Sequence, residues 1–222
     1  MVWTPMLNAQ AENDQMIAQQ VRTWDVLDTR VLDAMHSVAR EHFVPAAFGS
    51  LAYADCALPL PLGKRMLTPM LVGRILQALE LLPGDQVLEI GTGSGYLSAC
   101  LAALGARVQS LELHEPIANL ARTNLRAAGV EGIEVTCADG TALYSETAYD
   151  AIVLTASLPI YQPRFERALK FGGRLFVVVG VAPLMQARLV RRDGPNEFSS
   201  LALFETSIEA LEHAPSPPQF SF

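Results

Sequence analysis

Residues 87–96 read VLEIGTGSGY, and this stretch decides the fold. An apolar run ends at the acidic residue Glu89, and glycine then occupies alternate positions at 91, 93 and 95. Because glycine lacks a β-carbon, such a turn bends sharply and lets a ligand approach the backbone closely. The pattern therefore predicts a buried strand, a ligand-binding turn and a helix that begins near Tyr96.

The spacing of these glycines distinguishes between two classes of ligand. A dinucleotide-binding fingerprint, GxGxxG, that starts at Gly91 would require glycine at the position of Tyr96. A fingerprint that starts at Gly93 would require glycine or alanine where Ser98 stands. The sequence therefore disfavours NAD as the ligand, and a dehydrogenase is the enzyme class that it favours least.

The combination of Glu89 with the three glycines resembles the first motif of class I S-adenosylmethionine-dependent methyltransferases. In that family the glycine turn lies against the amino-acid end and the ribose of the cofactor. A carboxylate at the end of the second strand binds the ribose hydroxyls, and here Glu112 ends the apolar run ARVQSLEL. The resemblance implies cofactor contacts at Glu89, Gly91, Thr92, Gly93, Gly95, Glu112 and Leu113.

Two later segments add to the predicted cofactor site. Asp139 follows the run EVT and resembles the residue that receives the adenine amino group, while Gly140 gives the base room. Thr155 ends the fourth apolar run together with Ala156 and Ser157, at the edge where open α/β sheets bind ligands. Each feature alone has a plainer explanation, such as a strand-closing turn or a solvated charge. Their shared order favours a cofactor site.

Five short apolar runs, at residues 87–90, 108–111, 133–136, 151–154 and 174–179, alternate with segments of helical periodicity. This alternation is typical of a doubly wound, Rossmann-like α/β sheet. A helix is expected over 70–82, and residues 200–211 are candidates for further strands at one edge. We expect one domain, with a helical N-terminal extension and substrate loop at 1–69, a cofactor-binding core at 70–212 and a mobile tail at 213–222.

The N-terminal part combines helical periodicity with an irregular stretch. Apolar residues between positions 14 and 40 predict two short helices with a break near residues 23–25. Residues 52–69 contain three prolines and a glycine, which predicts a long loop of functional importance. Trp24 and Asp25 are expected to pack in the core, with a cover over the site or a dimer contact as the alternative.

Composition limits the classes of protein that remain. The 222 residues are 50% hydrophobic and carry a formal net charge of −7, with no basic run longer than a pair, which argues against nucleic-acid binding. The sequence has no signal-like start and no apolar stretch of about 18 residues, so we expect a cytoplasmic protein without a membrane partner, as monomer or homodimer. Cys56, Cys100 and Cys137 are too widely spaced for a zinc site, so buried free thiols and no metal are expected. The four histidines receive no chemical role.

Longer segments resemble the protein-L-isoaspartate O-methyltransferase family over roughly residues 15–190. They include VLDAMHSVAREHFVPAAFGSLAYAD at 31–55 and LKFGGRLFVVVG at 169–180, and residues 40–45 are the most distinctive part. The resemblance implies methyl transfer from S-adenosylmethionine to the α-carboxylate of isoaspartyl residues in aged proteins. Since a carboxyl group with a pKa near 4 is already ionised at neutral pH, positioning and exclusion of water would carry the catalysis.

The substrate loop departs from the family pattern. Where the family has Gly, Gln, Thr, Ile and Ser, this chain has residues 63–67, which read GKRML. The expected hydroxyls are therefore replaced by Arg65 and Leu67. Either Thr68 fills the gap, or Arg65 and Lys64 hold an anionic acceptor, unless these cations are merely solvated.

Asp55 belongs to the family's Tyr-x-Asp and is expected near the active site, with a loop-stabilising turn as an equal alternative. The candidate catalytic residues are thus Asp55, Arg65 and Thr68. Two further hypotheses remain open because of the altered loop. One is a methyltransferase for a small-molecule acceptor, and the other is a non-catalytic protein that binds S-adenosylmethionine without turnover.

Overall fold

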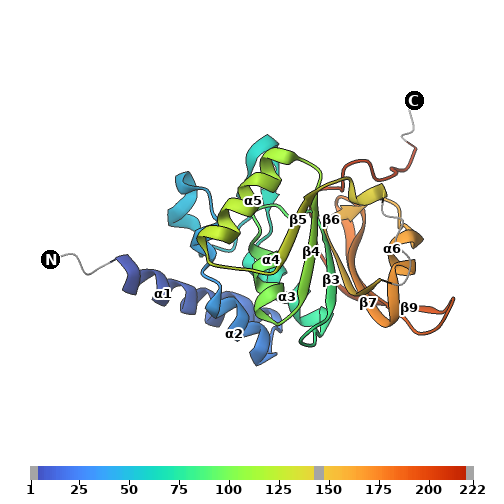
Figure 1. Cartoon of the computed structure of the whole chain (residues 1–222), viewed down its shortest axis with the longest axis horizontal. Coiled ribbons are helices and arrows are strands. Elements are labelled where there is room, and N and C mark those ends of the chain that lie inside the picture. The colour runs from blue at the N-terminus through green and yellow to red at the C-terminus, as the bar shows by residue number, and fades with distance from the viewer. Residues whose placement is uncertain (1–4, 143–147, 219–222) are drawn as a thin grey trace.

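The structure of the chain is a computed structural model that describes residues 5–142 and 148–218 (Figure 1). A seven-stranded sheet forms its centre, in the order β5-β4-β3-β6-β7-β8-β9. The strands of this sheet are β3 (Gln86–Ile90), β4 (Arg107–Glu112), β5 (Ile133–Cys137), β6 (Tyr149–Leu158), β7 (Leu169–Val181), β8 (Leu184–Arg192) and β9 (Phe198–Glu205).

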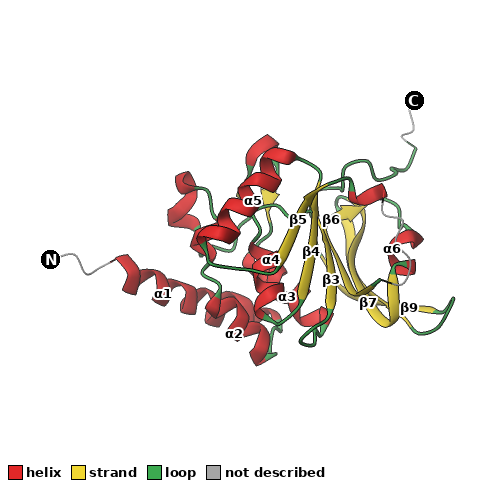
Figure 2. Ribbon diagram, viewed as in Figure 1, coloured by secondary structure: helices red, strands yellow, loops and turns green. Residues whose placement is uncertain are grey.

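Helices cover both faces of this sheet (Figure 2). One side carries α3 (Pro69–Leu79), α4 (Tyr96–Ala103) and α5 (Glu115–Ala127), and the other carries α6 (Pro163–Arg167). The N-terminal extension contains α1 (Pro5–Met16) and α2 (Thr29–Ser37). Short 3-10 or π turns occupy Ile17–Val21, Arg22–Trp24, Arg40–Phe43, Ala46–Leu51, Pro61–Gly63 and Gly140–Ala142. A small antiparallel pair, β1 (Leu58–Pro59) and β2 (Arg65–Met66), lies within the expected long loop.

The predicted α/β sheet is confirmed. All five predicted runs form strands, and β5, β4, β3, β6 and β7 pair in parallel. Strand β9 adds the expected edge, in antiparallel pairing with β8. Strand β8 itself lies outside every predicted run, because its buried residues Met185, Ala187 and Leu189 alternate with more exposed ones. Such alternation, rather than a continuous apolar run, is typical of an antiparallel strand near a sheet edge.

The central strands bury both of their faces. On β6, Ile152 and Leu154 belong to the core under α6, whereas Ala151 and Val153 belong to the core under α3 and α4. Because successive side chains of a strand point to opposite faces, a strand with helices on both sides needs a continuous apolar sequence. This requirement explains why the runs at 87–90 and 151–154 predicted the centre of the sheet so directly.

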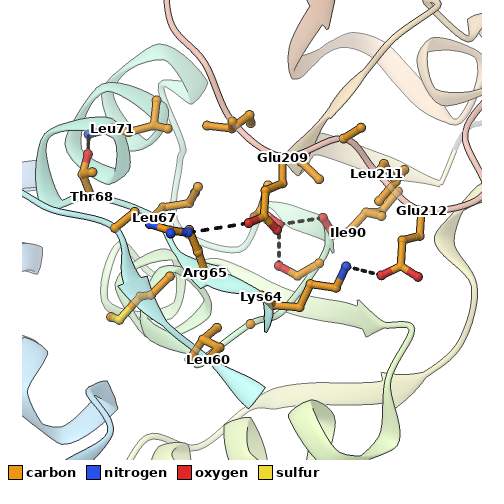
Figure 3. Close-up of a pocket in the computed structure, with 18 of the residues that line it drawn as sticks. Leu60, Lys64, Arg65, Leu67, Thr68, Leu71, Ile90, Glu209, Leu211 and Glu212 are labelled. Carbon is orange, nitrogen blue, oxygen red and sulfur yellow. Dashed lines mark hydrogen bonds and ion pairs between the residues drawn. The ribbon is translucent and has the colours of Figure 1, made fainter. Parts of the chain in front are cut away.

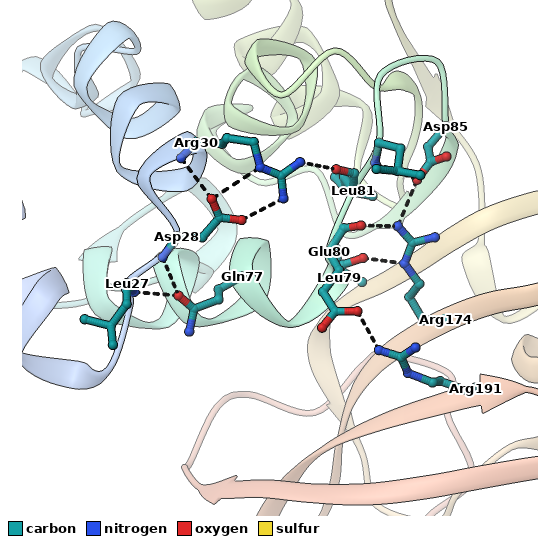
Figure 4. Close-up of polar contacts among 11 residues, drawn as sticks. Leu27, Asp28, Arg30, Gln77, Leu79, Glu80, Leu81, Asp85, Arg174 and Arg191 are labelled. Carbon is teal, nitrogen blue, oxygen red and sulfur yellow. Dashed lines mark hydrogen bonds and ion pairs between the residues drawn. The ribbon is translucent and has the colours of Figure 1, made fainter.

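The helix expected over 70–82 ends three residues earlier, at Leu79. Glu80 adopts a left-handed conformation with φ of 45°, which stops the helix. The Arg174 guanidinium, from β7, donates to the carbonyl oxygens of Leu79 and Glu80 and pairs with Asp85 at 2.9 Å (Figure 4). A tertiary contact from a distant strand therefore satisfies the carbonyls that the helix end leaves open.

The Gln77 side chain, from α3, makes three hydrogen bonds to the N-terminal extension. Gln77 Oε1 accepts hydrogen bonds from the backbone N–H groups of Leu27 at 2.6 Å and Asp28 at 3.0 Å (Figure 4). The Gln77 amide also donates to the Asp25 carbonyl oxygen at 2.6 Å. Asp25 has a positive φ of 58°, so the predicted break near residues 23–25 is confirmed. The first helix begins at Pro5, nine residues before the predicted region of periodicity starts at position 14.

Several other expectations need correction or remain open. Among the cysteines, Cys100 is buried as predicted, but Cys137 is exposed and Cys56 is only partly buried. The side chain of Trp24 is 47% exposed, so its assignment to the core is wrong. The expected tail is described only as far as residue 218, and its last four residues lie outside the described range. Within residues 5–142 and 148–218, every helix is too short or too polar to cross a bilayer.

Candidate active site

A cavity of about 560 Å³ lies at the carboxyl ends of the parallel strands. This volume falls within the range typical of sites for small molecules and cofactors. The cavity brings together predicted residues from five separate segments, which are Arg65, Thr68, Gly91, Gly93, Glu112, Leu113, Asp139, Gly140 and Thr155. Thus residues that are distant in the sequence meet where an open α/β sheet binds its ligand.

The glycine turn requires glycine for steric reasons. Gly91, Gly93 and Gly95 have positive φ values of 93°, 56° and 88°. A β-carbon on Gly91 would lie only 2.2 Å from Thr155 Oγ1. The same Thr155 hydroxyl donates a hydrogen bond of 2.6 Å to the Gly91 carbonyl oxygen. Thr155 therefore fixes the turn from the neighbouring strand, and only glycine fits against it.

Glu112 and Asp139 are both held in place by hydrogen bonds. The Glu112 carboxylate accepts from the Gly93 N–H at 3.0 Å and from the His114 N–H at 3.2 Å. Asp139 Oδ1 accepts from the Thr141 N–H at 2.8 Å and the Thr141 hydroxyl at 2.6 Å. Its other oxygen, Oδ2, pairs with His213 at 2.7 Å. Partial burial acts to raise the pKa of Asp139, but the bonds from Thr141 and His213 hold it below its usual value.

Glu89 and Thr92 lie beneath the turn rather than in the large cavity. The Glu89 carboxylate is fully buried, and Oε2 accepts hydrogen bonds from the hydroxyls of Ser98 and of Ser110, the latter at 2.7 Å. The Thr92 hydroxyl extends this chain to Ser110 at 2.6 Å. Both side chains line a separate cavity of about 40 Å³. Direct contacts of Glu89 and Thr92 with a cofactor therefore stay predictions.

The three candidate catalytic residues take different positions. Arg65 faces the cavity from β2, where its Nε lies 3.8 Å from Glu209 Oε1 (Figure 3). The Thr68 hydroxyl accepts a hydrogen bond from the Leu71 N–H at 3.3 Å and so caps α3. Asp55 is exposed, and its carboxylate lies 3.4 Å from the Met70 N–H at the start of the same helix. The structure thus places Arg65 in the cavity with only a long contact to Glu209, whereas the side chains of Thr68 and Asp55 contact backbone N–H groups at the start of α3.

Arg40, from the distinctive segment 40–45, supports the substrate loop from below. Its side chain is fully buried, with Nε donating to the Ala52 carbonyl at 2.9 Å and Nη2 donating to the Leu67 carbonyl at 3.0 Å. The guanidinium also lies 5.1 Å from the centre of the Tyr96 ring, at the start of α4. Arg40 thus ties both ends of the irregular stretch to the helix that follows the glycine turn.

The sequence did not predict the C-terminal side of the cavity, where residues 206–212 line it together with Arg74 and Phe204. Trp24 also lines the cavity, which agrees with the alternative of a cover over the site. The backbone of Ser157 holds the C-terminal segment, since its N–H donates to the Glu209 carbonyl and its C=O accepts from the Leu211 N–H, both at 2.8 Å. Ser157 was expected to line the cavity, but it is buried and used in this pairing. His114 and His213, which received no role, pair with Glu212 and Asp139.

Comparisons with known proteins agree with this geometry. The sequence profile of the protein-L-isoaspartate(D-aspartate) O-methyltransferase family matches residues 11–206. A protein-L-isoaspartate O-methyltransferase from Koribacter versatilis is 40% identical over 179 residues, which cover 80% of this chain and 81% of the relative. Another from Methanoculleus marisnigri is 45% identical over 186 residues, with coverage of 82% and 84%.

A solved structure shows the same fold. It is a crystal structure of a candidate protein-L-isoaspartate O-methyltransferase from Plasmodium falciparum, in complex with S-adenosyl-L-homocysteine. The TM-score is 0.77 at 16% identity, and the match covers 90% of this chain and 98% of the other. From the extent of the profile match and the identity to its relatives, this chain belongs to the protein-L-isoaspartate(D-aspartate) O-methyltransferase family.

Proposed function

We propose that this chain transfers a methyl group from S-adenosylmethionine to a carboxylate of isoaspartyl residues in damaged proteins. The observation that carries the proposal is the single cavity that joins the glycine turn, Glu112 and Asp139 to the cationic loop at Lys64 and Arg65. Relatives that are 40% and 45% identical bear the name of this activity. The structural neighbour from Plasmodium falciparum binds the demethylated product of the same cofactor.

The residues present fit S-adenosylmethionine. The turn at Gly91 and Gly93 leaves backbone exposed where a β-carbon would clash or strain the chain, which suits the close approach of a ligand. Glu112 would accept from the ribose hydroxyls, because a carboxylate has acceptor sites beyond those used by the Gly93 and His114 N–H groups. Asp139 and Gly140 would receive the adenine. When bound, the cofactor supplies an electrophilic methyl group on a sulfonium centre.

The chemistry demands positioning rather than acid or base catalysis. A carboxyl group with an ordinary pKa of about 4 is ionised at neutral pH, so no proton has to be removed. One carboxylate oxygen forms the bond to the methyl carbon while the carbon–sulfur bond breaks and its electron pair stays on sulfur. Arg65 would hold the acceptor carboxylate by charge-assisted hydrogen bonds, and the loop around it would exclude water. Thr68 and Asp55 would act by fixing the start of α3 beneath this loop.

The test is formation of base-labile methyl esters on an isoaspartyl peptide with radiolabelled S-adenosylmethionine. The matching aspartyl peptide is the control for recognition of the isomerised linkage. Label on the isoaspartyl peptide alone is the expected result. If neither peptide is labelled although the protein binds S-adenosylmethionine, the assignment to isoaspartyl repair is wrong.

A second candidate function is methylation of a small-molecule acid. The observation that favours it is the loop itself, in which Arg65 and Leu67 replace the hydroxyl residues of the family pattern and both line the cavity. The same assay with small free carboxylic acids, in place of the peptide, distinguishes the two functions. Binding of S-adenosylmethionine without turnover of either acceptor would instead favour a non-catalytic binding protein.

A further inference from the structure

The C-terminal segment 206–212 brings two carboxylates to the cations of the substrate loop. Figure 3 shows Glu209 and Glu212 reaching from this segment towards Arg65 and Lys64. All four side chains line the same cavity as the predicted cofactor residues. The loop cations are therefore neutralised from within the chain, at the place where an anionic acceptor has to bind.

Hydrogen bonds fix the backbone of this segment, whereas its side chains can change rotamer. Ser157, at the end of β6, pairs with residues 209–211 as an additional strand would, through hydrogen bonds of 2.8 Å to Glu209 and Leu211. Ser157 is itself buried. An acceptor can therefore displace a glutamate side chain by rotation about its own bonds, without detaching the segment.

The two ion pairs differ in geometry and exposure. Glu212 contacts both Lys64 and His114, the latter at 2.8 Å, and these bonds lower the pKa of Glu212 to about 2. Arg65 and Glu209 lie 3.8 Å apart, beyond hydrogen-bond distance, with side chains that are 61% and 48% exposed. Exposed pairs of this kind contribute little, so the Arg65 pair is the one that opens easily.

Arg65 is also the cation with the most capacity for a new partner. Three lysine or arginine residues of the described chain line the cavity, and they are Lys64, Arg65 and Arg74. Lys64 is engaged by Glu212. The Arg74 guanidinium donates to the Trp24 carbonyl at 2.8 Å and lies 4.6 Å from the centre of the Phe204 ring. Only Arg65 combines a long, exposed contact with a place inside the cavity.

We propose that Glu209 occupies the position on Arg65 that the acceptor carboxylate takes, which makes Glu209 a determinant of acceptor affinity. The inference rests on the proposed function, since it assumes a carboxylate acceptor. Each acceptor competes with this internal carboxylate for the same guanidinium. Glu209 therefore raises KM for every acceptor that is held through Arg65, and it has no part in the methyl transfer itself.

The test compares Glu209→Gln with Glu205→Gln in the full chain. Glu205 also lines the cavity, at the end of β9, so its variant makes the same change in net charge nearby. Glu209→Gln should lower KM for the isoaspartyl peptide by about two- to five-fold, the range expected for an exposed ion pair. The kcat and the Kd for S-adenosylmethionine should stay unchanged. In an Arg65→Gln background, Glu209→Gln should leave KM unaltered.

Three results would overturn the inference. An unchanged or higher KM in Glu209→Gln would show that Glu209 does not compete with the acceptor. An equal fall in KM in Glu205→Gln would show a general effect of charge. Persistence of the Glu209→Gln effect without Arg65 would show that another group is the site of competition.

A binding measurement separates this inference from the proposed function. Calorimetry, with S-adenosylhomocysteine present, gives the Kd of the isoaspartyl peptide and of the same peptide with its free α-carboxylate amidated. Tighter binding of the first peptide alone to Glu209→Gln would support the inference even if no methyl group is transferred. Absence of any carboxylate-dependent binding to either protein would overturn it.

Discussion

Replacing the buried Glu89 by glutamine should stabilise the protein at alkaline pH and have little effect in acid. The Glu89 carboxylate lies at the end of β3 with no exposed surface. Oε2 is hydrogen-bonded to two serine hydroxyls, but Oε1 has no partner among the described residues. Burial raises the pKa of Glu89 from 4.5 to about 7, in spite of the opposing hydrogen bonds from Ser98 and Ser110.

This raised pKa determines the direction of the effect. Below pH 4.5 the carboxyl group is protonated in both the folded and the unfolded chain, so its burial carries no ionisation penalty. Between pH 4.5 and about 7 the unfolded chain loses the proton while the folded chain retains it, and stability falls as pH rises. Above pH 7 the loss of stability reaches its limit. This limit is roughly 3 kcal/mol, because each pKa unit between the unfolded and folded values corresponds to about 1.4 kcal/mol.

The assay is urea unfolding of wild type and Glu89→Gln at pH 4.5 and pH 8. Glutamine has nearly the same shape and can still bond to both serines, because hydroxyls donate as well as accept. We expect the variant to gain up to about 3 kcal/mol over wild type at pH 8 and much less at pH 4.5. Glu134→Gln, at an exposed position of β5, is the control. A stability difference between Glu89→Gln and wild type that is independent of pH, or a loss that grows with pH, would refute the reasoning.

Three further predictions concern the cavity. Gly91→Ala should weaken binding of S-adenosylmethionine, measured by calorimetry, at least about tenfold, because a β-carbon at this position would clash with Thr155. Gly84→Ala is the control and should leave this binding unchanged, since Gly84 has a similar φ of 90° but a β-carbon there would have no atom within 4 Å. Arg65→Ala should raise KM for the acceptor far more than the Kd for S-adenosylmethionine, and equal small changes would exclude a role in holding the acceptor. Glu212→Gln should lose at most about 1 kcal/mol of unfolding free energy at pH 7 and clearly less at pH 2. The low pKa of Glu212 means that its ion pairs stabilise the fold fully above pH 4.5 and that this stabilisation is lost as pH falls through about 2.

The parts of the fold that local sequence determines could be predicted. The strand at 87–90 is buried on both faces, so its apolar residues Val87, Leu88 and Ile90 are required by the position that it occupies. Gly91 is required by its φ and by Thr155, and both constraints belong to the turn itself and its neighbouring strand. Strand β8 could not be found in the same way, because Gln186, Arg188 and Arg191 interrupt its apolar residues, so it lacks the apolar run that marks the central strands.

The C-terminal wall of the site could not be predicted, because distant pairing creates it. Residues 209–211 are placed by hydrogen bonds to Ser157, 52 residues away from Glu209. Nothing in the segment IEALEH marks it as part of a cavity, and Lys64 and Arg65 are separated from their partners by well over a hundred residues. The surroundings of Glu89 could not be predicted either. The sequence places an acidic residue before a glycine turn, but it does not tell whether the side chain faces a ligand or two buried serines.

Segment 40–45 carries the most distinctive part of the family resemblance, and the structure gives its Arg40 a supporting role that the sequence did not predict. Its buried guanidinium donates to the carbonyl oxygens of Ala52 and Leu67, and these bonds fix the position of the loop that carries Arg65. Within the part of the chain that the structure describes, no carboxylate pairs with Arg40, and burying it is costly because desolvation opposes its charge and lowers its pKa. Such a residue persists where its geometry is needed, and the planar fork of arginine is the side chain that can bridge two carbonyls at once. The loop that carries Arg65 and Leu67 is therefore supported from segment 40–45, through the two hydrogen bonds that Arg40 donates.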